Sequence, residues 1–570
     1  MRTPTIVLGL ALALGLSGPA LGQATTNTQT QGREYKRQGP KPAPTYGWWN
    51  DAVFYQVFVR SFADAKTGPL AGDGIGDFVG LTERLDYLND GNPATTTDLG
   101  VTALWLMPMH PSPSYHGYDI TDYFGVNPQY GTMQDFEKFL AACHQRGIRV
   151  ILDLVMNHCS NRHPWFVEAR DPKSPKHDWF IWAERKPDYL GPWNAPNWHA
   201  ADGRDGKTRW YYGLFSPEMP DLNYENDTVT AQMQDVVRFW LTQKNVDGFR
   251  LDAIRHLIED GRQQDNTPQT HAWLQKFYTF YKGVKPDAYT VGEVWAPAPD
   301  ASEYVGDKLD ATFDFDLSNA VIASLTGGEA APLEKALCAN WVQFPHNQFG
   351  NFLQNHDQPR MMTQLLRPKG TPRAQAEAEM RLAVTLQMLM PGTPYIYYGE
   401  ELGMVGDKPD PDIRTPMQWS GAAGAGFTTG TPWRKVNADY TSINVAAQDG
   451  DPKSLLNLYR DLIRLRQSEP AIRRGGLEVL PTGNAGVLAF VRSEQGGGVE
   501  NPGAGGVLVV ANVSGKPIKD FTLKLGGWSP AGPDGKTGLL GQAGLGAVRD
   551  GALPIPELPA RSAVVVRVSK

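Results

Sequence analysis

The feature that most constrains the fold is a regular alternation of apolar strand-like runs with amphipathic helical segments. About eight such pairs follow one another between residues 47 and 472, from AVFYQVFV at 52–59, through ATFDFDL at 311–317, to PYIYYG at 394–399. Strands that alternate with helices form parallel sheets. Eight pairs match the closed barrel better than an open doubly wound sheet. We therefore expect an α/β protein built on a (β/α)8 TIM barrel.

Several of the strand-like runs end in charged or polar side chains. VDGFRLD carries Arg250 and Asp252, AYTVGE ends in Glu293, and NFLQNHD ends in His356 and Asp357. Because strands of a parallel sheet are buried on both faces, these groups must face a cleft or be paired internally. A TIM barrel has its active site at the carboxyl ends of the strands. Together these strand ends favour a reaction site over isolated structural ion pairs.

Two changes in the pattern indicate further domains. Residues 159–220 are too many for an ordinary connection and are rich in Trp and Tyr, which predicts a small inserted domain with one or two rings free to stack on a ligand. From residue 473 onward, short β runs alternate with Gly and Pro loops, which predicts an antiparallel β-sandwich over 473–570. The barrel would then consist of residues 47–158 and 221–472.

The amino terminus predicts export. Residues 1–22 combine an early Arg2, the apolar run IVLGLALALGL and terminal small residues, a pattern typical of a secretory signal peptide, and residues 23–46 are expected to be a linker. No later apolar run is long enough to span a bilayer. The net charge of -7, without long like-charge runs, gives no attraction for nucleic acid or anionic membranes. We expect a secreted or periplasmic monomer.

The cysteines indicate neither a disulfide framework nor a metal site. The chain has 3 of them, Cys143, Cys159 and Cys338, which is too few for a disulfide framework, and they lack the paired spacing of a metal site. At most one bridge could form. We expect thiols that lie in the core.

Six motifs resemble those of the α-amylase family of glycoside hydrolases, in the order the family has them. They are DLVMNH at 153–158, MPDLN at 219–223, GFRLDAIRH at 248–256, GEVW at 292–295, FLQNHD at 352–357 and PGTPYIYYGEE at 391–401. One such motif would be weak evidence, but six in register are specific. MPDLN resembles the motif found in the branch of the family that lies between oligo-1,6-glucosidases and neopullulanases. The resemblance implies a retaining hydrolase of α-glucans or malto-oligosaccharides that works through a covalent glycosyl-enzyme intermediate.

The resemblance also implies roles for the residues at the strand ends. Asp252 resembles the nucleophile, Glu293 the general acid and base, and Asp357 the third carboxylate, which binds sugar hydroxyls. Arg250 lies two residues before Asp252 and therefore on the same strand face, where it would hold Asp252 ionised at neutral pH. Glu293 must stay protonated in the free enzyme, which burial and nearby carboxylates would favour.

Further residues resemble the family's substrate contacts. His158 and His356 resemble the imidazoles that contact the reacting sugar, and Tyr118 would stack under that sugar because an aromatic face matches the apolar face of a pyranose. Asp119 and Arg360 resemble the pair that contacts the outer hydroxyls of the terminal glucose in α-glucosidases. The alternative is a salt bridge between two barrel loops.

The run DGIGD at 73–77 is acidic and rich in glycine, as an oxygen-ligand cation loop would be. It resembles the calcium loop of oligo-1,6-glucosidase relatives, with Asp73, the Ile75 carbonyl and Asp77 as ligands. The insertion KTGPLAG displaces the family's upstream ligands and leaves Asp64 as the nearest acid, so a turn that caps the next helix is the alternative. A second family calcium site would use Asn157 with a carboxylate of the inserted domain. We expect calcium and no organic cofactor.

The residue after the nucleophile helps to choose among activities. It is Ala253 rather than the Val typical of α-1,6-specific relatives, which favours α-1,4 bonds. We expect an α-amylase with some transfer to sugar acceptors. An α-glucosidase or a trehalose-forming isomerase is the alternative, since residues 445–466 resemble those enzymes too, although such isomerases normally lack export signals. A non-catalytic glucan-binding protein is disfavoured, because all the expected catalytic carboxylates and Arg250 are present.

Overall fold

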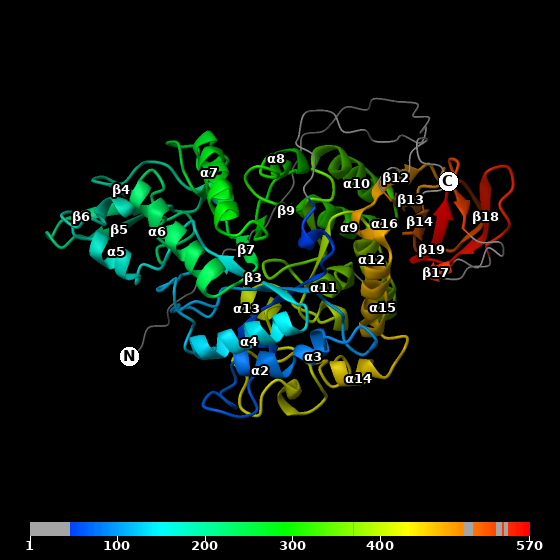
Figure 1. The fold of residues 1–570 in the computed structure, drawn as a ribbon, viewed down its shortest axis with the longest axis horizontal. Helices are drawn as coiled ribbons and strands as arrows, with labels where there is room; N and C mark the ends of the chain where they lie inside the picture. The colour runs from blue at the N-terminus through cyan, green and yellow to red at the C-terminus, as the bar shows by residue number, and fades with distance from the viewer. Residues whose placement is uncertain (1–45, 369, 495–504, 532–537, 541–544) are drawn as a thin grey trace.

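The computed structural model describes residues 46–570, except 369, 495–504, 532–537 and 541–544. The predicted signal peptide at 1–22 and, apart from Tyr46, the predicted linker at 23–46 lie outside the described residues. A barrel of parallel strands forms the centre of the molecule (Figure 1). Around the barrel the strands are β1 (Phe54–Val57), β11 (Thr393–Tyr397), β10 (Phe349–Phe352), β9 (Ala311–Phe313), β8 (Tyr289–Gly292), β7 (Gly248–Leu251), β3 (Arg149–Leu154) and β2 (Ala103–Leu106). The predicted TIM barrel is confirmed.

The register of neighbouring strands determines which side chains leave the barrel together. Asp153 on β3 pairs with Arg250 on β7. Leu251 on β7 pairs with Gly292 on β8. Asp252 and Glu293, each the next residue along its strand, therefore leave the barrel side by side at its carboxyl end.

Helices that follow the strands cover the outside of the barrel. The longer ones are α4 (Met133–Gln145), α6 (Asp227–Arg238), which continues as the π-helical turn η4 (Phe239–Gln243), α7 (Pro268–Val284), α9 (Phe315–Gly327), α10 (Ala331–Gln343), α12 (Arg373–Leu389) and α15 (Leu455–Ser468). Shorter helices include α1 (Val59–Phe62), α2 (Phe78–Glu83), α3 (Leu85–Leu88), α8 (Ala298–Ser302), α11 (Met361–Leu366), α13 (Asp410–Ile413), α14 (Val445–Asp449) and α16 (Pro470–Arg474).

One predicted strand is shorter than its sequence pattern suggests. The run ATFDFDL forms a strand only over β9, and helix α9 begins at Phe315. The carboxylate of Asp314 accepts the backbone N–H of Leu317 at 3.1 Å and so caps the helix. Alternating Phe and Asp residues resemble a half-buried strand, but here the second Phe already belongs to the helix.

A small separate sheet forms between β3 and α6. It has the order β4 (Trp182–Ala183), β6 (Thr208–Tyr212) and β5 (Trp198–Asp202), next to α5 (Pro164–Ala169), η2 (His177–Trp179) and η3 (Pro192–Asn194). Trp198, Tyr212 and Leu214 form its buried cluster. Most of the aromatic residues of this segment are therefore occupied in packing. Figure 1 shows the segment at the left end of the molecule, opposite the carboxyl terminus.

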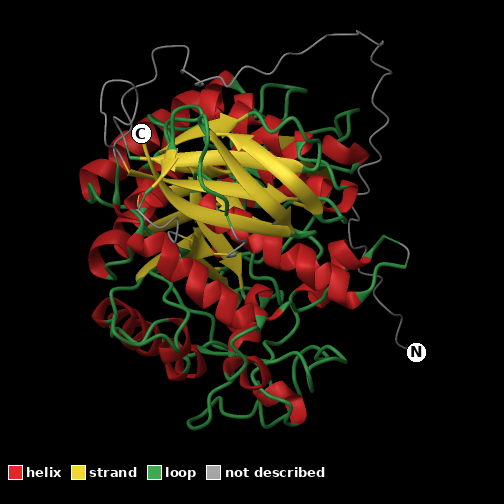
Figure 2. Cartoon of the chain, turned by 90° about the vertical axis from the view of Figure 1, so that its right-hand side faces the viewer, coloured by secondary structure: helices red, strands yellow, loops and turns green. Residues whose placement is uncertain are grey.

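The described residues from 476 onward form antiparallel β structure, as predicted. One sheet contains β12 (Gly476–Leu480), β13 (Val487–Ser493), β14 (Gly505–Asn512), β19 (Ser562–Ser569), β16 (Ser529–Pro530) and β17 (Gly538–Leu540), and a second pairs β15 (Ile518–Lys524) with β18 (Ala552–Leu558). One hydrophobic cluster, which includes Leu508, Leu523 and Ile555, joins the two sheets. Figure 2 shows these strands in front of the barrel helices.

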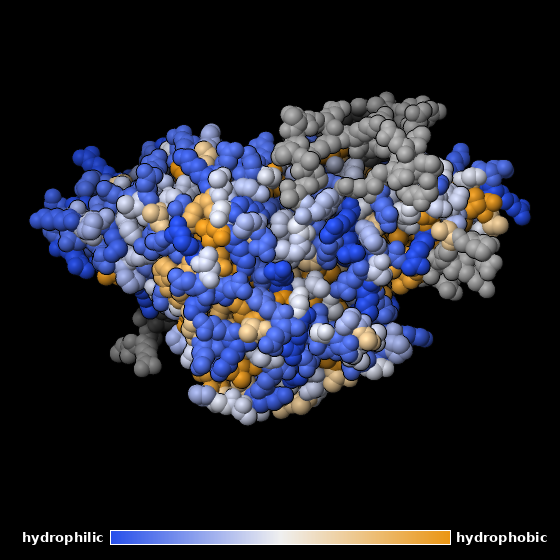
Figure 3. Space-filling model, in the orientation of Figure 1, coloured by the Kyte–Doolittle hydropathy of each residue, from blue (hydrophilic) through white to orange (hydrophobic). Residues whose placement is uncertain are grey.

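The surface is mostly polar, and two of the three thiols are buried. The face in Figure 3 is largely hydrophilic, with apolar residues scattered among polar ones. Within the described residues, we find no helix with the length and apolar character needed to cross a bilayer. Cys143 and Cys159 are buried thiols, as expected, whereas Cys338 is only partly buried.

Candidate active site

Arg250 lies at the centre of the candidate site, at the end of β7, and its side chain is 1% exposed. Its Nη1 donates to Oδ1 of Asp252 at 2.7 Å and to Oδ1 of Asp153 at 2.7 Å. Its Nη2 lies 2.7 Å from Oε2 of Glu293. A single guanidinium thus gathers carboxylates from β3, β7 and β8. The predicted nucleophile and the predicted acid are therefore neighbours.

The backbone after the nucleophile turns sharply and holds the acid. Ala253 has a φ of 49°, a left-handed conformation that residues other than glycine seldom adopt. Its N–H donates to Oε2 of Glu293 at 3.1 Å. On the other side, Nε1 of Trp295 donates to Oε1 of Glu293 at 2.7 Å. Three donors therefore fix the position of the Glu293 carboxyl before any substrate binds.

Burial controls the protonation of the carboxyl cluster. It raises the pKa of Asp252 from 3.8 to about 7 and the pKa of Glu293 from 4.5 to about 7, although Arg250 acts in the opposite direction on both. The charges of Asp153 and Asp357 raise the pKa of Asp252 further. The expectation that Arg250 holds Asp252 ionised at neutral pH is therefore wrong, because burial outweighs the charge of Arg250. Near neutral pH the cluster retains a proton, as general acid catalysis requires.

The third carboxylate, Asp357, lies in a loop that follows β10. Nη2 of Arg414 donates to its Oδ1 at 2.9 Å. Nε2 of His356 lies 3.1 Å from its Oδ2. The ring of Tyr118 stacks on the ring of His356, with 5.6 Å between centroids. The charge of Asp357 raises the pKa of both Asp252 and Glu293, so all three predicted catalytic carboxyls share one site.

Both predicted substrate-binding histidines are neutral. Burial lowers the pKa of His158 to about 3 and lowers the pKa of His356 well below its usual range. Nε2 of His158 is buried and has no hydrogen-bond partner within the described part of the chain. Nδ1 of His356 lies 2.7 Å from the side-chain amide of Gln56. His158 therefore has a ring nitrogen available for a sugar hydroxyl.

The expected pair of Asp119 and Arg360 does not form. Asp119 accepts from the hydroxyl of Ser112 at 2.6 Å and from the hydroxyl of Ser114. Arg360 is 0% exposed, and its guanidinium donates to the carbonyls of Tyr398 at 2.8 Å and Ile413 at 3.1 Å. Nη2 of Arg360 is buried and has no hydrogen-bond partner among the described residues, so a role for Arg360 in substrate binding stays a prediction. A role for Asp119 in substrate binding stays a prediction.

The structure places three residues at the site to which the sequence assigned no role. Asp153 stands four residues before Asn157 in the matched motif DLVMNH, at a polar strand end that the sequence already indicates, but the resemblance assigns it no catalytic role. Trp295 lies two residues after Glu293 in the matched motif GEVW. Arg414 follows the short helix α13 in a long loop and is 2% exposed. No local pattern distinguishes Arg414 from other arginines, and only the fold brings it to Asp357.

The acids of the predicted calcium loop accept hydrogen bonds from backbone N–H groups. Asp77 caps α2 and accepts the N–H groups of Gly80 and Ala65 at 2.8 and 2.9 Å. Asp64 accepts the N–H groups of Gly72 and Gly74, both at 3.0 Å. Asp73 accepts the N–H of Ile75 at 2.8 Å. The acids thus satisfy backbone donors, which matches the capping-turn alternative, and these residues do not fit a calcium ion.

Asn157, from the second predicted calcium site, contacts Asp221, the first residue after the predicted inserted domain. Nδ2 of Asn157 donates to Oδ2 of Asp221 at 3.0 Å, while the buried Oδ1 of Asn157 has no hydrogen-bond partner among the described residues. Burial raises the pKa of Asp221 to about 7. Across the described residues, no group of three or more His, Cys, Asp or Glu could hold a metal ion. The oxygens of Asn157 and Asp221 fit an oxygen-bound cation only as part of its ligand set.

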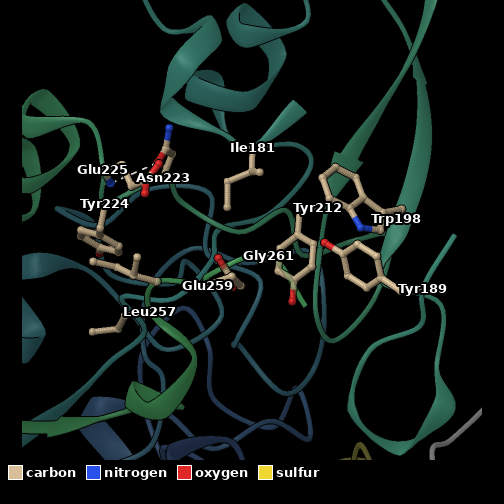
Figure 4. A pocket seen from close by; sticks show the side chains of 11 residues that line it. Ile181, Tyr189, Trp198, Tyr212, Asn223, Tyr224, Glu225, Leu257, Glu259 and Gly261 are labelled. Atoms are coloured by element: carbon tan, nitrogen blue, oxygen red, sulfur yellow. Dashed lines mark hydrogen bonds between the residues drawn. The ribbon is translucent and has the colours of Figure 1, made fainter. Parts of the chain in front are cut away.

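A pocket of about 200 Å³ lies between the inserted segment and the loop after β7. In Figure 4 the carboxyl of Glu259 points into the pocket, with Tyr212 and Trp198 on one side and Tyr224 on the other. Burial and the charge of Asp221 raise the pKa of Glu259 well above its usual range. The pocket is distinct from the carboxyl cluster around Arg250.

Comparisons with known proteins show the family of the chain. The model of the family described as "Alpha amylase, catalytic domain" matches residues 56–475. Alpha-amylase 3 of Dictyoglomus thermophilum is 37% identical over 453 residues, which cover 78% of this chain and 82% of that protein. Trehalose synthase/amylase TreS of Mycolicibacterium smegmatis is 35% identical and covers 86% and 88%. An oligo-1,6-glucosidase of Heyndrickxia coagulans is 32% identical and covers 85% and 96%.

The fold supports the same relationship. The crystal structure of the α-amylase from H. orenii superimposes with a TM-score of 0.75 at 35% identity, over 91% of this chain and 99% of that one. The relatives include α-amylase, trehalose synthase and oligo-1,6-glucosidase, which agrees with a branch close to the oligo-1,6-glucosidases. The chain belongs to the α-amylase family of glycoside hydrolases and is an enzyme that acts on α-glucans.

Proposed function

We propose that this protein is an exported, retaining α-1,4-glucan hydrolase of the α-amylase type that acts on starch and malto-oligosaccharides. One observation carries the proposal: the guanidinium of Arg250 contacts both Asp252 and Glu293, at 2.7 Å in each case. Retaining hydrolysis needs a nucleophilic carboxylate and an acid close together, whereas inversion needs room for a water molecule between them. Two carboxyls bound to one guanidinium support retention.

The reaction proceeds in two displacements at the anomeric carbon. The carboxylate of Asp252 attacks this carbon while Glu293 gives its proton to the departing glycosidic oxygen, so that one C–O bond forms as the other breaks. Water then attacks the same carbon, Glu293 takes up its proton, and the bond to Asp252 breaks. Two inversions leave the product in the α configuration.

The remaining side chains bind the reacting sugar. Asp357 would accept sugar hydroxyls, and Arg414, which is buried against it, holds its carboxyl in place. His158 offers its free Nε2. The stacked rings of Tyr118 and His356 form an aromatic floor for the apolar face of a glucose ring. This set matches one pyranose at the reacting position.

Two finer parts of the proposal rest on sequence. Ala253 after the nucleophile favours α-1,4 over α-1,6 bonds, and the signal-like residues 1–22 favour a secreted or periplasmic location. We also propose calcium beside Asn157 and Asp221, where it would supply positive charge that ties the inserted segment to the end of β3. No step of the reaction depends on this ion.

An α-glucosidase or trehalose-forming isomerase is the second candidate. It is favoured by the relative named trehalose synthase/amylase, whose 35% identity extends over 547 residues. Such an enzyme would return the glycosyl group to a sugar that stays in the site. The same carboxyl cluster could perform either reaction, because the two reactions differ only in what attacks the intermediate.

Early products from starch, maltotriose, pullulan, sucrose and maltose decide between these activities. An α-amylase releases malto-oligosaccharides from starch, an α-glucosidase releases glucose from chain ends, and an isomerase converts maltose to trehalose. Proton NMR of the first product from starch should show the α anomer. A first product in the β configuration would rule out the two-displacement mechanism, and absence of activity on starch would rule out the amylase assignment.

A further inference from the structure

The pocket between the inserted segment and the loop after β7 contains two buried polar atoms without partners. Trp198, on β5, is 7% exposed, and within the described part of the chain no group accepts its Nε1–H. Oε1 of Glu259, in the loop after η5 (Ile254–His256), is also buried, and no described group donates to it. Both residues line the pocket. A native chain rarely leaves a buried polar atom unpaired unless water or a ligand satisfies it.

Four aromatic rings of the described chain line the same pocket. Trp198 meets Tyr212 at 5.3 Å between ring centroids, and Tyr189 lies edge-on to Trp198 at 6.3 Å. Tyr224 faces them from the other side, and the carboxyl of Glu259 points into the space between (Figure 4). The hydroxyls of Tyr212 and Tyr224 already donate to other groups of the chain, at 2.9 and 2.7 Å. The pocket therefore offers aromatic faces together with a free indole N–H and a free carboxyl oxygen.

Charge and hydrogen bonding determine which ligand suits the pocket. Burial, and then the charge of Asp221, raise the pKa of Glu259 well above its usual range, so this carboxyl is uncharged near neutral pH. An uncharged carboxyl beside an indole N–H gives little attraction for a cation. A hydroxyl both donates and accepts, so a ligand with several hydroxyls can meet both free atoms. The aromatic rings also favour an apolar ring face, and a pyranose has one.

The size of the pocket limits the ligand to about one sugar ring. Its volume of about 200 Å³ is several times the roughly 30 Å³ that one water molecule occupies in the liquid. It is also smaller than the roughly 300 Å³ at which sites for drug-sized ligands begin. Glu225 and Gly261, which are both exposed, form part of the lining, so the pocket opens to solvent. A monosaccharide can therefore enter, whereas a long oligosaccharide cannot be enclosed.

We propose that this pocket binds a free hexose in its pyranose form, at a site separate from the catalytic carboxyls. One sugar hydroxyl accepts from Nε1 of Trp198, another meets the carboxyl of Glu259, and the apolar face of the ring packs on the aromatic walls. Glucose is the probe of choice, because it is the unit of the α-glucans on which the family acts. The inference goes beyond the proposed function, and this binding requires no catalysis.

The bound sugar joins the inserted segment to the barrel. Trp198 and Tyr212 belong to the inserted sheet, whereas Glu259 belongs to the loop after β7. Gln264 of the same loop accepts from the hydroxyl of Tyr212 at 2.9 Å, and its carbonyl lies 2.9 Å from Nδ1 of His256. A ligand that contacts both sides binds the folded chain and not the unfolded one. We therefore expect glucose to raise the melting temperature of the protein.

Isothermal titration calorimetry with glucose tests the proposal. Trp198→Phe removes the indole N–H but keeps an aromatic ring, and Glu259→Leu removes the carboxyl. We expect each variant to weaken glucose binding at the pocket about 10-fold or more, which is the effect of one lost hydrogen bond. Competitive inhibition of starch hydrolysis by glucose reports the catalytic centre instead. Its inhibition constant should stay within about twofold of the wild type in both variants, because the two sites are separate.

Two controls separate pocket binding from other effects. Trp182→Phe makes the same substitution on β4 of the same small sheet, at a residue that does not line the pocket. Nε1 of Trp182 donates to the carbonyl of His177 at 2.9 Å, so this variant should leave glucose binding unchanged even if it melts earlier. Glycerol has hydroxyls but no apolar ring face, and we expect it to bind about 10-fold more weakly than glucose. Circular dichroism confirms that each variant is folded.

The outcomes distinguish this inference from the proposed function. If both pocket variants keep the glucose binding and the glucose-induced rise in melting temperature of the wild type, the pocket holds water only and the inference is wrong. An equal loss of binding in Trp182→Phe would also overturn it, because the loss would then come from the inserted sheet as a whole. If the wild type binds glucose in the pocket but hydrolyses no α-glucan, the proposed function fails and this inference stands.

Discussion

The buried acid should cost the enzyme stability at alkaline pH, and Glu293→Gln should remove that cost. Burial raises the pKa of Glu293 from 4.5 to about 7. The folded state therefore binds this proton more tightly than the unfolded state does. Its contribution to stability is fully present below pH 4.5 and is lost as the pH rises through 7. The rise in pKa corresponds to about 3 kcal/mol of lost stability above pH 8.

The glutamine variant cannot ionise, so it should not show this loss. Its amide nitrogen must turn away from Arg250 or Trp295, which costs roughly 1 kcal/mol for one hydrogen bond but does not depend on pH. This cost is the same at pH 5 and pH 8, so it cancels when the free energies of unfolding at the two pH values are subtracted. We expect Glu293→Gln to gain about 2 to 3 kcal/mol over the wild type between these two pH values, while its hydrolysis rate falls by orders of magnitude.

The assay is thermal or denaturant unfolding of the wild type and the variant at both pH values. Glu557→Gln, which changes an exposed acid in β18, serves as the matched control and should show no such difference. If the stability difference between Glu293→Gln and the wild type is the same at pH 5 and pH 8, burial does not govern the protonation of Glu293. Burial would then not explain how Glu293 stays protonated for its role as general acid.

Three further predictions test other parts of the site. Asp252→Asn should lower hydrolysis of starch at least about 1000-fold without unfolding the chain, and near wild-type turnover would contradict its role as nucleophile. Arg414→Ala leaves Asp357 without its buried partner and should lower kcat/KM about 100-fold. Arg367→Ala is the control: it removes an exposed ion pair with Asp407 and should leave kcat/KM unchanged. A chelator should lower the melting temperature by a few degrees if calcium binds beside Asn157, and an unchanged midpoint would remove that proposal.

The barrel could be predicted because its information is local and repeated. Each strand is a short apolar run whose last residues are polar, and the alternation with helices allows few topologies. At ATFDFDL the predicted strand forms but ends early, because a carboxylate cap at Asp314 starts a helix inside an alternating pattern. Strand periodicity and helix capping compete over the same few residues, and only packing decides between them.

The catalytic carboxyls could be predicted because each lies at the end of a strand within a matched motif. Arg414 could not, since it reaches Asp357 from a loop that only the folded chain brings close. The protonation of Asp252 was also misjudged. A single arginine two residues away is visible in the sequence, whereas complete burial and the charges of Asp153 and Asp357 are visible only in the structure.

The left-handed turn at Ala253 has a consequence for redesigning bond preference. A methyl side chain tolerates a φ of 49°, but the branched side chain of valine fits this conformation poorly and would add about 1 to 2 kcal/mol of strain. An Ala253→Val substitution, made to favour α-1,6 bonds, would therefore destabilise this turn. The turn also positions Glu293, because the backbone N–H of Ala253 donates to its carboxyl. A workable redesign would have to reshape the whole segment from Ala253 to His256.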